Sequence, residues 1–232
     1  MNGQYAIAID GPSGAGKSSL ARRCASRFGF LYVDTGAIYR TVGLAAFRRG
    51  IDRRDEAAVS AMLPELEIRM AYNEQGEQRM YLNGEDVSAA IRMPEISLCA
   101  SDVSAHQGVR SFLLEMQRKF ARENNVVMDG RDIGTVVLPD ARLKVFLTAS
   151  PEARAKRRLA ELLAKGESQS FEEVLRDIRY RDEQDTARAA APLRKADDAV
   201  ELDSSDLNFD ETFAVLCELV ITRLAVEPEA AE

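Results

Sequence analysis

The feature that most constrains the fold is an eight-residue loop near the start of the chain. Residues 11–18 read GPSGAGKS and fit the phosphate-gripping pattern G-x-x-x-x-G-K-[ST]. An apolar, β-prone run at 5–10 precedes the loop and predicts a strand. After the loop, Leu20, Cys24 and Phe28 are spaced four apart, which predicts one face of a helix. A strand, a glycine-rich loop and a helix in this order form the context in which such loops bind phosphate.

The residue types of this loop suit a nucleotide triphosphate. Its glycines let backbone N–H groups turn toward an anion, and the helix N-terminus adds partial positive charge. Lys17 is placed to reach the β- and γ-phosphates, and the Ser18 hydroxyl to ligate Mg²⁺. The alternative is a glycine-rich turn that happens to precede a helix. The predicted ATP-binding residues are Gly11, Pro12, Ser13, Gly14, Ala15, Gly16, Lys17, Ser18 and Ser19.

Composition limits the class of protein. The 232 residues are 46% apolar and 30% charged, with no apolar run of membrane-spanning length and no signal-peptide pattern, so we expect a cytoplasmic globular protein. A net charge of −7 argues against general nucleic-acid binding, so local clusters must meet any anionic substrate. Three cysteines and one histidine have neither disulfide nor zinc spacing, which predicts reduced core thiols and a surface or hydrogen-bonded His106.

The order of elements predicts an α/β fold. Helical patterns separate five short apolar segments, and near-continuously apolar strands are typical of a parallel sheet covered by helices. Two pairs, Ser170 with Glu173 and Asn208 with Glu211, have the spacing of capping boxes that begin helices. The five predicted strands are 5–10, 30–33, 126–129, 142–148 and 199–203, and further helices are predicted at 37–49, 109–123 and from 150 onward.

Residues 63–100 interrupt this alternation. Strand-like patterns at 66–72 and 78–82 flank a turn signal at 73–76. We expect a small antiparallel insertion here, with a third short strand near 87–92.

A second candidate site lies at residues 34–40, where a predicted strand gives way to a helix. Asp34, Thr35 and Arg40 arrive together there, and Arg40 with Thr35 suits a second phosphate. The alternative is that Thr35 only caps the helix and Arg40 lies in solvent.

A third candidate follows the apolar strand at 126–128. A carboxylate at the end of such a strand, downstream of a P-loop, is typical of a Mg²⁺ ligand, which here is Asp129. Arg131 and Asp132 would project into the same cleft. Asp132 could instead cap the segment 133–137.

The fourth candidate is the run at 179–188. On a helix, Arg181, Asp185 and Arg188 share one face. An exposed helix laced with salt bridges would show the same spacing. The P-loop favours the functional interpretation, because phosphoryl transfer needs mobile cations that close over the phosphates.

Taken together, the motifs at 11–18, 34–40, 129–137 and 181–188, the last followed by Ala191-Pro192-Leu193, resemble those of the bacterial cytidylate kinases, a family of P-loop nucleoside monophosphate kinases. The resemblance runs from about residue 5 to 225. It implies one P-loop kinase core over 1–232, a nucleoside-monophosphate subdomain at 63–100 and a helical lid at 154–190. It also implies transfer of the γ-phosphoryl group of ATP, with Mg²⁺, to CMP or dCMP in pyrimidine nucleotide metabolism.

The same resemblance implies roles for individual residues. The acceptor phosphate would be held by Thr35, Tyr39, Arg40 and Arg131, the cytosine by Ser101, Arg110 and Asp132, and the ribose by Arg181 and Asp185. Arg188 would lie between the substrates, and Arg157 and Arg158 would approach the ATP phosphates. The implied catalytic residues are Lys17, Arg131, Arg158 and Arg188, and the implied metal ligands are Ser18 and Asp129. Alternatively, Ser101 belongs to a helix start and Arg110 lies in solvent.

The base-reading set is chemically sensible, because a carboxylate paired with an arginine matches the N4 donor and the N3 and O2 acceptors of cytosine. Uracil would present the wrong edge. The rival functions are a P-loop kinase for UMP, AMP or a non-nucleotide acceptor, and a nucleotide-dependent switch, although the chain lacks the N-K-x-D motif that reads guanine. We expect a monomer, with no nucleic-acid or membrane partner.

Overall fold

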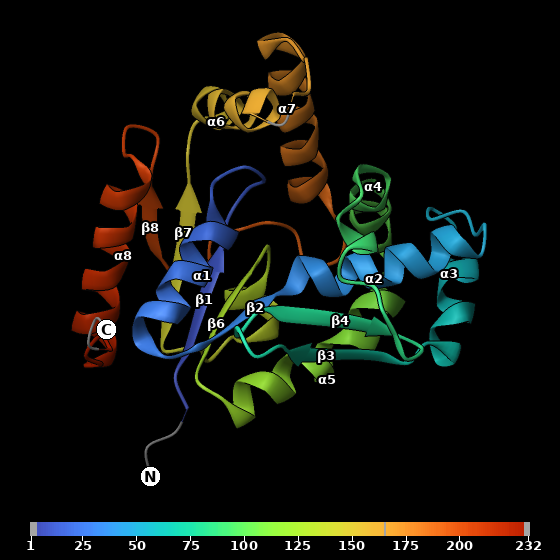
Figure 1. Ribbon diagram of the computed structural model, residues 1–232, viewed down its shortest axis with the longest axis horizontal. Coiled ribbons are helices and arrows are strands. Elements are labelled where there is room, and N and C mark those ends of the chain that lie inside the picture. Colours follow the sequence, from blue (N-terminus) through green and yellow to red (C-terminus); the bar gives the residue numbers. More distant parts are fainter. Residues whose placement is uncertain (1–3, 165, 230–232) are drawn as a thin grey trace. The chain divides into compact units, whose positions relative to one another are not determined.

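The structure, a computed structural model, describes residues 4–164 and 166–229. The chain divides into two compact units, the first comprising Met1–Tyr32 with Glu123–Glu232 and the second Val33–Arg122. The first unit holds β1 (Ala6–Asp10), α1 (Lys17–Phe28), the first half of β2 (Leu31–Asp34) up to Tyr32, β6 (Val126–Gly130), a π-helical turn (Ile133–Val137), β7 (Leu143–Thr148), α6 (Pro151–Ala164), α7 (Phe171–Ala187), β8 (Val200–Asp203) and α8 (Phe209–Leu224) (Figure 1).

The predicted five-stranded sheet is confirmed, in the order β2-β6-β1-β7-β8. β1 pairs in parallel with β6 on one side and with β7 on the other, and β7 pairs in parallel with β8. The central strand β1 therefore delivers the P-loop to the carboxyl edge of the sheet, where ligands of parallel sheets bind.

One face of this sheet is covered by α1 and α8 (Figure 1). Apolar side chains of alternate strand positions, such as Ile7, Ile9 and Val145, pack there against Leu20 of α1 and Leu216 of α8, all of them fully or almost fully buried. Burial of this apolar surface is the main force that fixes the sheet and hence the loops at its carboxyl edge.

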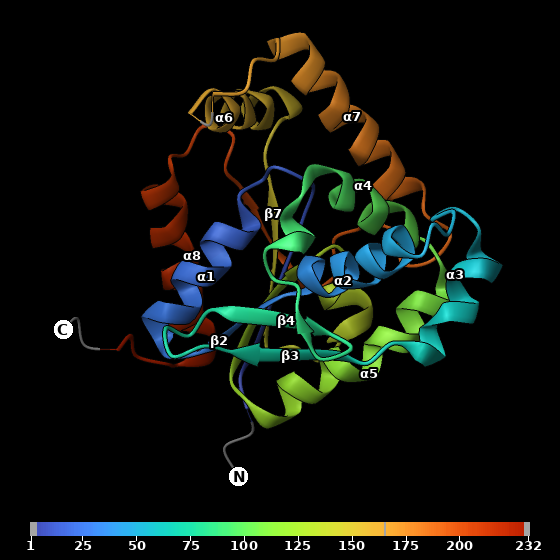
Figure 2. The ribbon, with the colours of Figure 1, turned by 45° about the vertical axis from the view of Figure 1, so that its right-hand side comes forward.

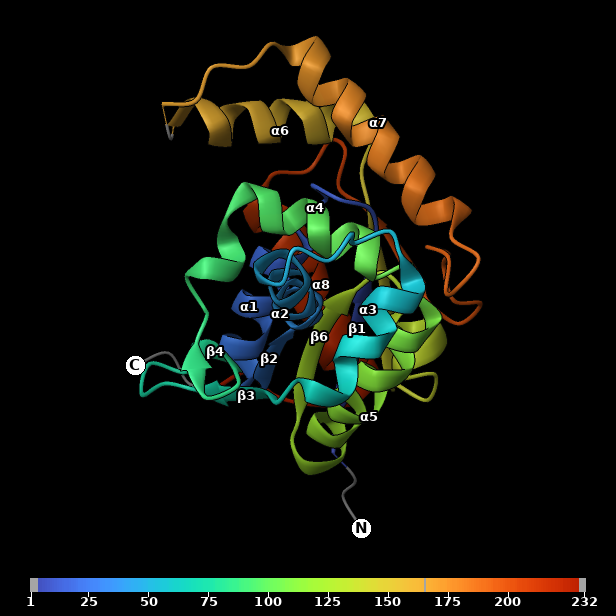
Figure 3. The same cartoon turned by 90° about the vertical axis from the view of Figure 1, so that its right-hand side faces the viewer.

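The helices α6 and α7 pack against each other through a small separate core of Ala155, Leu162, Val174 and Ile178 (Figure 3). Both predicted capping boxes are present, at Ser170 for α7 and at Asn208 for α8. Each satisfies backbone N–H groups that a helix start would otherwise leave unpaired.

The second unit contains α2 (Thr35–Arg48), α3 (Glu56–Met62), α4 (Pro94–Val103) and most of α5 (Gln107–Glu123), with 3₁₀ turns at Leu63–Glu65 and Ala90–Arg92. It also contains the predicted antiparallel sheet, in which β3 (Ile68–Tyr72) pairs with β4 (Gln78–Leu82) (Figure 2).

The position predicted for the third strand of this sheet is wrong. β5 is Glu85–Asp86, and residues 90–92 form the 3₁₀ turn instead. Asn83 and Gly84 both have positive φ, so they form a two-residue hairpin in which Leu82 pairs with Glu85. Because the turn has only two residues, the third strand begins directly after it. The Asn-Gly dipeptide is the sequence signal that could have located this strand.

In the second unit, α2 and α4 approach closely at Gly43. A Cβ on Gly43 would lie 2.9 Å from the backbone N of Ala100 and 3.1 Å from Cys99. The absence of a side chain at this position therefore allows the contact between the two helices.

The three cysteines are free thiols, and His106 is buried with its Nε2 2.8 Å from the carbonyl oxygen of Arg53, so it is a hydrogen-bonded core residue. In the part of the chain that the structure describes, no helix is both long and apolar enough to cross a bilayer.

Candidate active site

The P-loop lies between β1 and α1, and its first glycine is sterically required. Gly11 has φ +150°, and a Cβ there would lie 1.9 Å from the carbonyl oxygen of Leu147. Gly16, with φ +88°, is the N-cap of α1 and has the left-handed conformation that glycine tolerates best. The loop thus turns sharply from β1 into α1 and presents a helix N-terminus to an anion.

Lys17 is buried, and its Nζ donates to the carbonyl oxygen of Pro12 at 2.7 Å. Burial, together with the positive charge of Arg131, lowers the pKa of Lys17 to about 7. The side chain is therefore folded back over its own loop, and a phosphate against Nζ would favour its charged form.

Ser18 and Asp129, the two predicted metal ligands, are in contact. The Ser18 hydroxyl donates to Asp129 Oδ2 at 2.9 Å, and the Tyr32 hydroxyl donates to Asp129 Oδ1 at 2.9 Å. The buried carboxylate is therefore held on both oxygens by hydroxyl groups from α1 and β2. Tyr32 was not singled out in the sequence because nothing in its spacing ties it to Asp129.

Asp10, the last residue of β1, was also missed. It is buried and accepts hydrogen bonds from the backbone N–H groups of Ile133 and Gly134, at 2.8 and 2.7 Å. Burial raises the pKa of Asp10 to about 6, although these two donors oppose the shift. Through these two hydrogen bonds, Asp10 fixes the start of the π-helical turn that follows Arg131 and Asp132.

Asp132 is itself buried at this turn. Within the described chain its side chain makes no capping hydrogen bond to residues 133–137, so the alternative prediction that Asp132 caps this segment is wrong. Asp10 supplies the acceptor for the first N–H groups of the turn instead.

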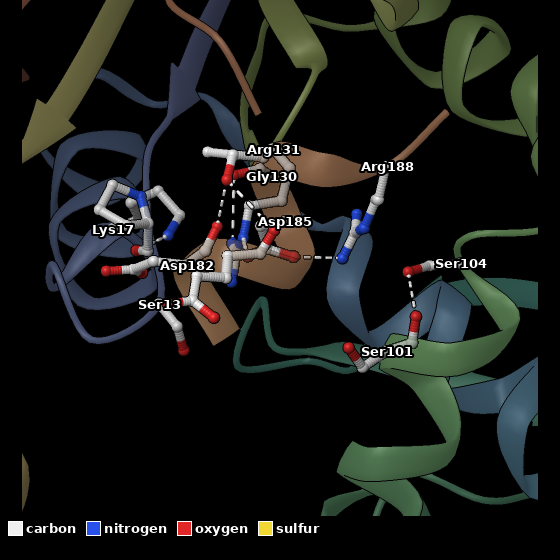
Figure 4. A network of polar contacts seen from close by, with 12 residues as sticks. Ser13, Lys17, Ser101, Ser104, Gly130, Arg131, Asp182, Asp185 and Arg188 are labelled. Carbon is white, nitrogen blue, oxygen red and sulfur yellow. Dashed lines mark hydrogen bonds and ion pairs between the residues drawn. The ribbon is translucent and has the colours of Figure 1, made fainter. Parts of the chain in front are cut away.

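Arg131 and Arg188 meet on Asp185, which is buried (Figure 4). Arg131 Nε lies 2.6 Å from one carboxylate oxygen of Asp185, and Arg188 donates to the other. Burial opposes ionisation of Asp185, but the two guanidinium groups outweigh it and hold its pKa below the usual value. Arg188 follows the end of α7 as its C-cap, and Arg181 is exposed on that helix.

The two arginines predicted to approach ATP differ in setting. Arg157 donates to the Ser204 hydroxyl at 3.2 Å and to the carbonyl oxygens of Ser204 and Leu207, so it is tied to the loop between β8 and α8. Arg158 is exposed and pairs with Glu161 on its own helix at 3.1 Å.

In the second unit, Asp34 is the centre of an ion cluster. It caps α2 by accepting from the backbone N of Ala37, and its Oδ2 lies 2.9 Å from both Arg40 and Arg92. Burial opposes ionisation of Asp34, but Arg40 and Arg92 hold its pKa below the usual value. Thr35 is therefore not the cap, and Arg40 is part of a charged cluster. Arg92, which comes from the 3₁₀ turn, lay in a segment that we expected to be a strand.

Arg110 is buried, which contradicts the alternative that it lies in solvent. It donates to the carbonyl oxygen of Ser104 at 3.1 Å, and its guanidinium carbon lies 5.6 Å from the centre of the Tyr39 ring. Ser101 lies near the end of α4, not at a helix start, and its carbonyl oxygen accepts from the Ser104 hydroxyl (Figure 4). A buried arginine beside an aromatic ring suits recognition of a flat polar ligand.

Comparisons with known proteins agree on one family. A sequence model described as cytidylate kinase matches residues 7–222. The chain is 48% identical to the cytidylate kinase of Geobacter sulfurreducens, over 97% of this chain and 96% of that one. It is 50% identical to the cytidylate kinase of Geobacter sp. (strain M21), over 94% of each chain. The crystal structure of an uncharacterized protein from Eubacterium ventriosum covers 95% of this chain with a TM-score of 0.51 at 13% identity, a likeness of fold alone.

Proposed function

This chain belongs to the cytidylate kinase family, and from that premise we infer that it transfers the γ-phosphoryl group of ATP to CMP or dCMP. The products are ADP and CDP or dCDP. The observation that carries this function is the P-loop between β1 and α1, with the buried Lys17 beside Ser18 and Asp129. These groups supply the anion cradle, the cation and the carboxylate that phosphoryl transfer requires.

On the ATP side, the backbone of Gly11–Ser19 binds the triphosphate. Lys17 reaches the β- and γ-phosphates by leaving its contact with Pro12. Arg157 and Arg158 of α6 add positive charge from the neighbouring helix. The shape of the loop supports this assignment, because a glycine-rich turn before a helix N-terminus directs several backbone N–H groups toward one point.

Ser18 and Asp129 fit a magnesium ion. Both offer oxygen, the ligand atom that Mg²⁺ prefers, and Ser18 Oγ lies 2.9 Å from Asp129 Oδ2. No group of three or more His, Cys, Asp or Glu suited to a metal occurs among the described residues, which agrees with an ion that takes its other ligands from phosphate and water. When bound, Mg²⁺ neutralises charge on the β- and γ-phosphates.

Residues of the acceptor side are proposed in each unit. Arg131, Asp132, Arg181, Asp185 and Arg188 come from the first unit, and Thr35, Tyr39, Arg40, Ser101 and Arg110 from the second. The arginines of this set bind the acceptor phosphate, and Asp185 binds the ribose. Asp132, Arg110 and Ser101 read the cytosine, because a carboxylate accepts from its N4 amino group and an arginine donates to N3 and O2.

The chemistry needs positioning and positive charge more than a base. The phosphate of CMP is already ionised near neutral pH, so no strong proton acceptor is required. Lys17, Arg131, Arg158 and Arg188 stabilise the charge that develops as the γ-phosphoryl group moves in line between the two oxygens. Before the substrates bind, Asp185 holds the side chains of Arg131 and Arg188 in position.

Membership of the cytidylate kinase family also supports proposals on the oligomeric state, the cellular location and the subdomains. The protein acts as a monomer in pyrimidine nucleotide metabolism in the cytoplasm. Residues 63–100, which include the three-stranded sheet, form the acceptor subdomain, and residues 154–190, which include most of α6 and all of α7, form the lid.

The test is to follow the γ-phosphoryl group of labelled ATP. With CMP present, the label should appear in CDP, and without CMP it should stay in ATP. Lys17→Ala should lower kcat roughly 100-fold or more, because a charge on the transferring group is lost. Release of the label mainly as inorganic phosphate would indicate a hydrolytic switch and overturn the proposal, as would normal turnover by Lys17→Ala.

A further inference from the structure

One buried arginine outside the proposed substrate contacts joins three parts of the first unit. Arg154 of α6 is 3% exposed and donates to the carbonyl oxygens of Ala149 and of Ser13, at 2.9 and 3.0 Å. Its two terminal nitrogens also bind both carboxylate oxygens of Asp182 on α7, at 2.9 and 2.6 Å. A bidentate pair of this kind fixes the relative orientation of the groups that it joins.

A second residue of the P-loop, Gly14, lies close to both helices. A Cβ built on Gly14 would lie 3.5 Å from Arg154 Cβ and 3.9 Å from Cδ1 of Ile178 on α7. Ile178 belongs to the small core that holds α6 and α7 together. The carbonyl oxygen of Ser13 and the backbone of Gly14 therefore lie against the packed pair α6 and α7. We expect a change in the loop conformation to shift α7.

The same helix carries the acceptor machinery one turn further on. Asp182 and Asp185 are three residues apart on α7, about 4.5 Å along the helix axis. Asp182 binds the arginine that holds the P-loop, and Asp185 binds Arg131 and Arg188 (Figure 4). Because a helix segment this short is rigid, a shift of Asp182 moves Asp185 with it.

We propose that Arg154 and Asp182 form a clamp that couples the two substrate sites, so that ATP bound in the P-loop tightens the binding of CMP. The proposal rests on the proposed function, since it assigns the P-loop to ATP and the Asp185 cluster to CMP. Phosphates bound by the loop amides fix the peptide of Ser13, the clamp transmits its position to α7, and Asp185 then presents Arg131 and Arg188. Both clamp residues are positioning residues.

The coupling must be reciprocal. If an ATP analogue tightens CMP binding by a given factor, CMP tightens binding of the analogue by the same factor. This requirement separates a true coupling from an effect of the clamp on one site alone.

The experiment measures the Kd of CMP by calorimetry, with and without a saturating non-hydrolysable ATP analogue and Mg²⁺. Asp182→Asn keeps the size of the side chain and removes the charge that makes the bidentate pair. The matched control is Glu152→Gln, because Glu152 and Arg179 also join α6 to α7, at 2.8 Å, in an ion pair with both side chains about half exposed. That pair makes no contact with the P-loop among the interactions of the described residues.

In the unaltered protein we expect the analogue to tighten CMP binding about fivefold or more. In Asp182→Asn this factor should fall below about twofold, with the Kd of CMP alone nearly unchanged, and in Glu152→Gln it should persist. If Asp182→Asn fails to fold, Arg154→Lys, which keeps the charge but cannot hold the bidentate pair, should show the same loss.

Equal coupling factors in the clamp variant and the unaltered protein would overturn the inference. So would an unaltered protein that binds both ligands independently. A protein that binds the analogue but not CMP would overturn the proposed function itself, and the inference with it.

Discussion

Three buried carboxylates lie at or near the ends of the strands β1, β6 and β2, and each is held by a different kind of donor. Asp10 accepts from two backbone N–H groups, Asp129 from two hydroxyl groups, and Asp34 from a backbone N–H group and two arginines. At two of them the balance between burial and the partners sets the pKa: burial prevails at Asp10 and raises its pKa, whereas the arginines prevail at Asp34 and lower it. The same residue type thus has a different role at each strand end.

Asp10 should make stability depend on pH. Its pKa is about 6 in the folded protein against 3.8 as the reference, so the folded state holds the proton more tightly. Its stabilising contribution is complete below about pH 4 and is lost as pH rises through 6. Between pH 4 and 7, the free energy of unfolding of the unaltered protein should fall by about 2 kcal/mol relative to Asp10→Asn, as measured by denaturant titration. A difference that stays constant with pH would contradict this view of Asp10.

Asp132 should discriminate between the two substrates. Asp132→Asn replaces by an amide the carboxylate that we propose accepts from the cytosine amino group, and hydrogen bonds to charged groups contribute about 1.5–3 kcal/mol. The KM for CMP should therefore rise on the order of tenfold to a hundredfold, while the KM for ATP stays within about twofold. Steady-state kinetics with each substrate varied in turn would check this. Equal losses for both substrates would remove Asp132 from base recognition.

At the scale of elements, regular periodicity was enough to predict most of the fold. The strands β1 and β6 are buried along almost their whole length, and α7 and α8 begin with capping boxes, so apolar runs and capping residues locate these elements to within one or two positions. The prediction of the third strand of the small sheet was wrong because the strand follows directly on the Asn83-Gly84 turn. Beyond it, the buried residues Val87 and Ile91 are four apart, which is the spacing of a helical turn. A short segment of this kind has too few residues for a period to decide.

The contact between α2 and α4 supports an element-scale prediction. Gly43→Ala would place a methyl group 2.9 Å from the backbone of Ala100, one residue before Ser101, so α4 must shift. We expect a loss of about 1–3 kcal/mol in the free energy of unfolding, together with weaker CMP binding. Thermal unfolding and the KM for CMP measure the two effects.

The matched control for this change is Asn208→Ala, which removes the capping box of α8 in the other unit. It should cost about 1 kcal/mol of stability and leave the KM for CMP unchanged. If both variants raised this KM alike, general loss of stability would explain the effect of Gly43→Ala.

At the scale of the whole molecule, sequence motifs singled out the residues that we propose to bind substrates, but not the residues that hold them in place. The P-loop, Asp129 and Asp185 carry recognisable spacing. Asp10, Tyr32 and the Arg154–Asp182 pair act through partners 28 to 124 residues away, and such pairs leave no local pattern. Only folding brings them together, through the central position of β1 and the packing of α6 on α7.

The proposed function requires a cytosine nucleotide as the acceptor. The most direct test is the rate of ADP formation from Mg²⁺-ATP with CMP, dCMP, UMP, AMP and no acceptor, compared as kcat/KM. We expect activity concentrated on CMP and dCMP, with UMP poorer by on the order of tenfold or more, because uracil would present mismatched hydrogen-bonding groups to the base-reading residues proposed above. Equal or better use of UMP or AMP, or no use of CMP, would contradict it.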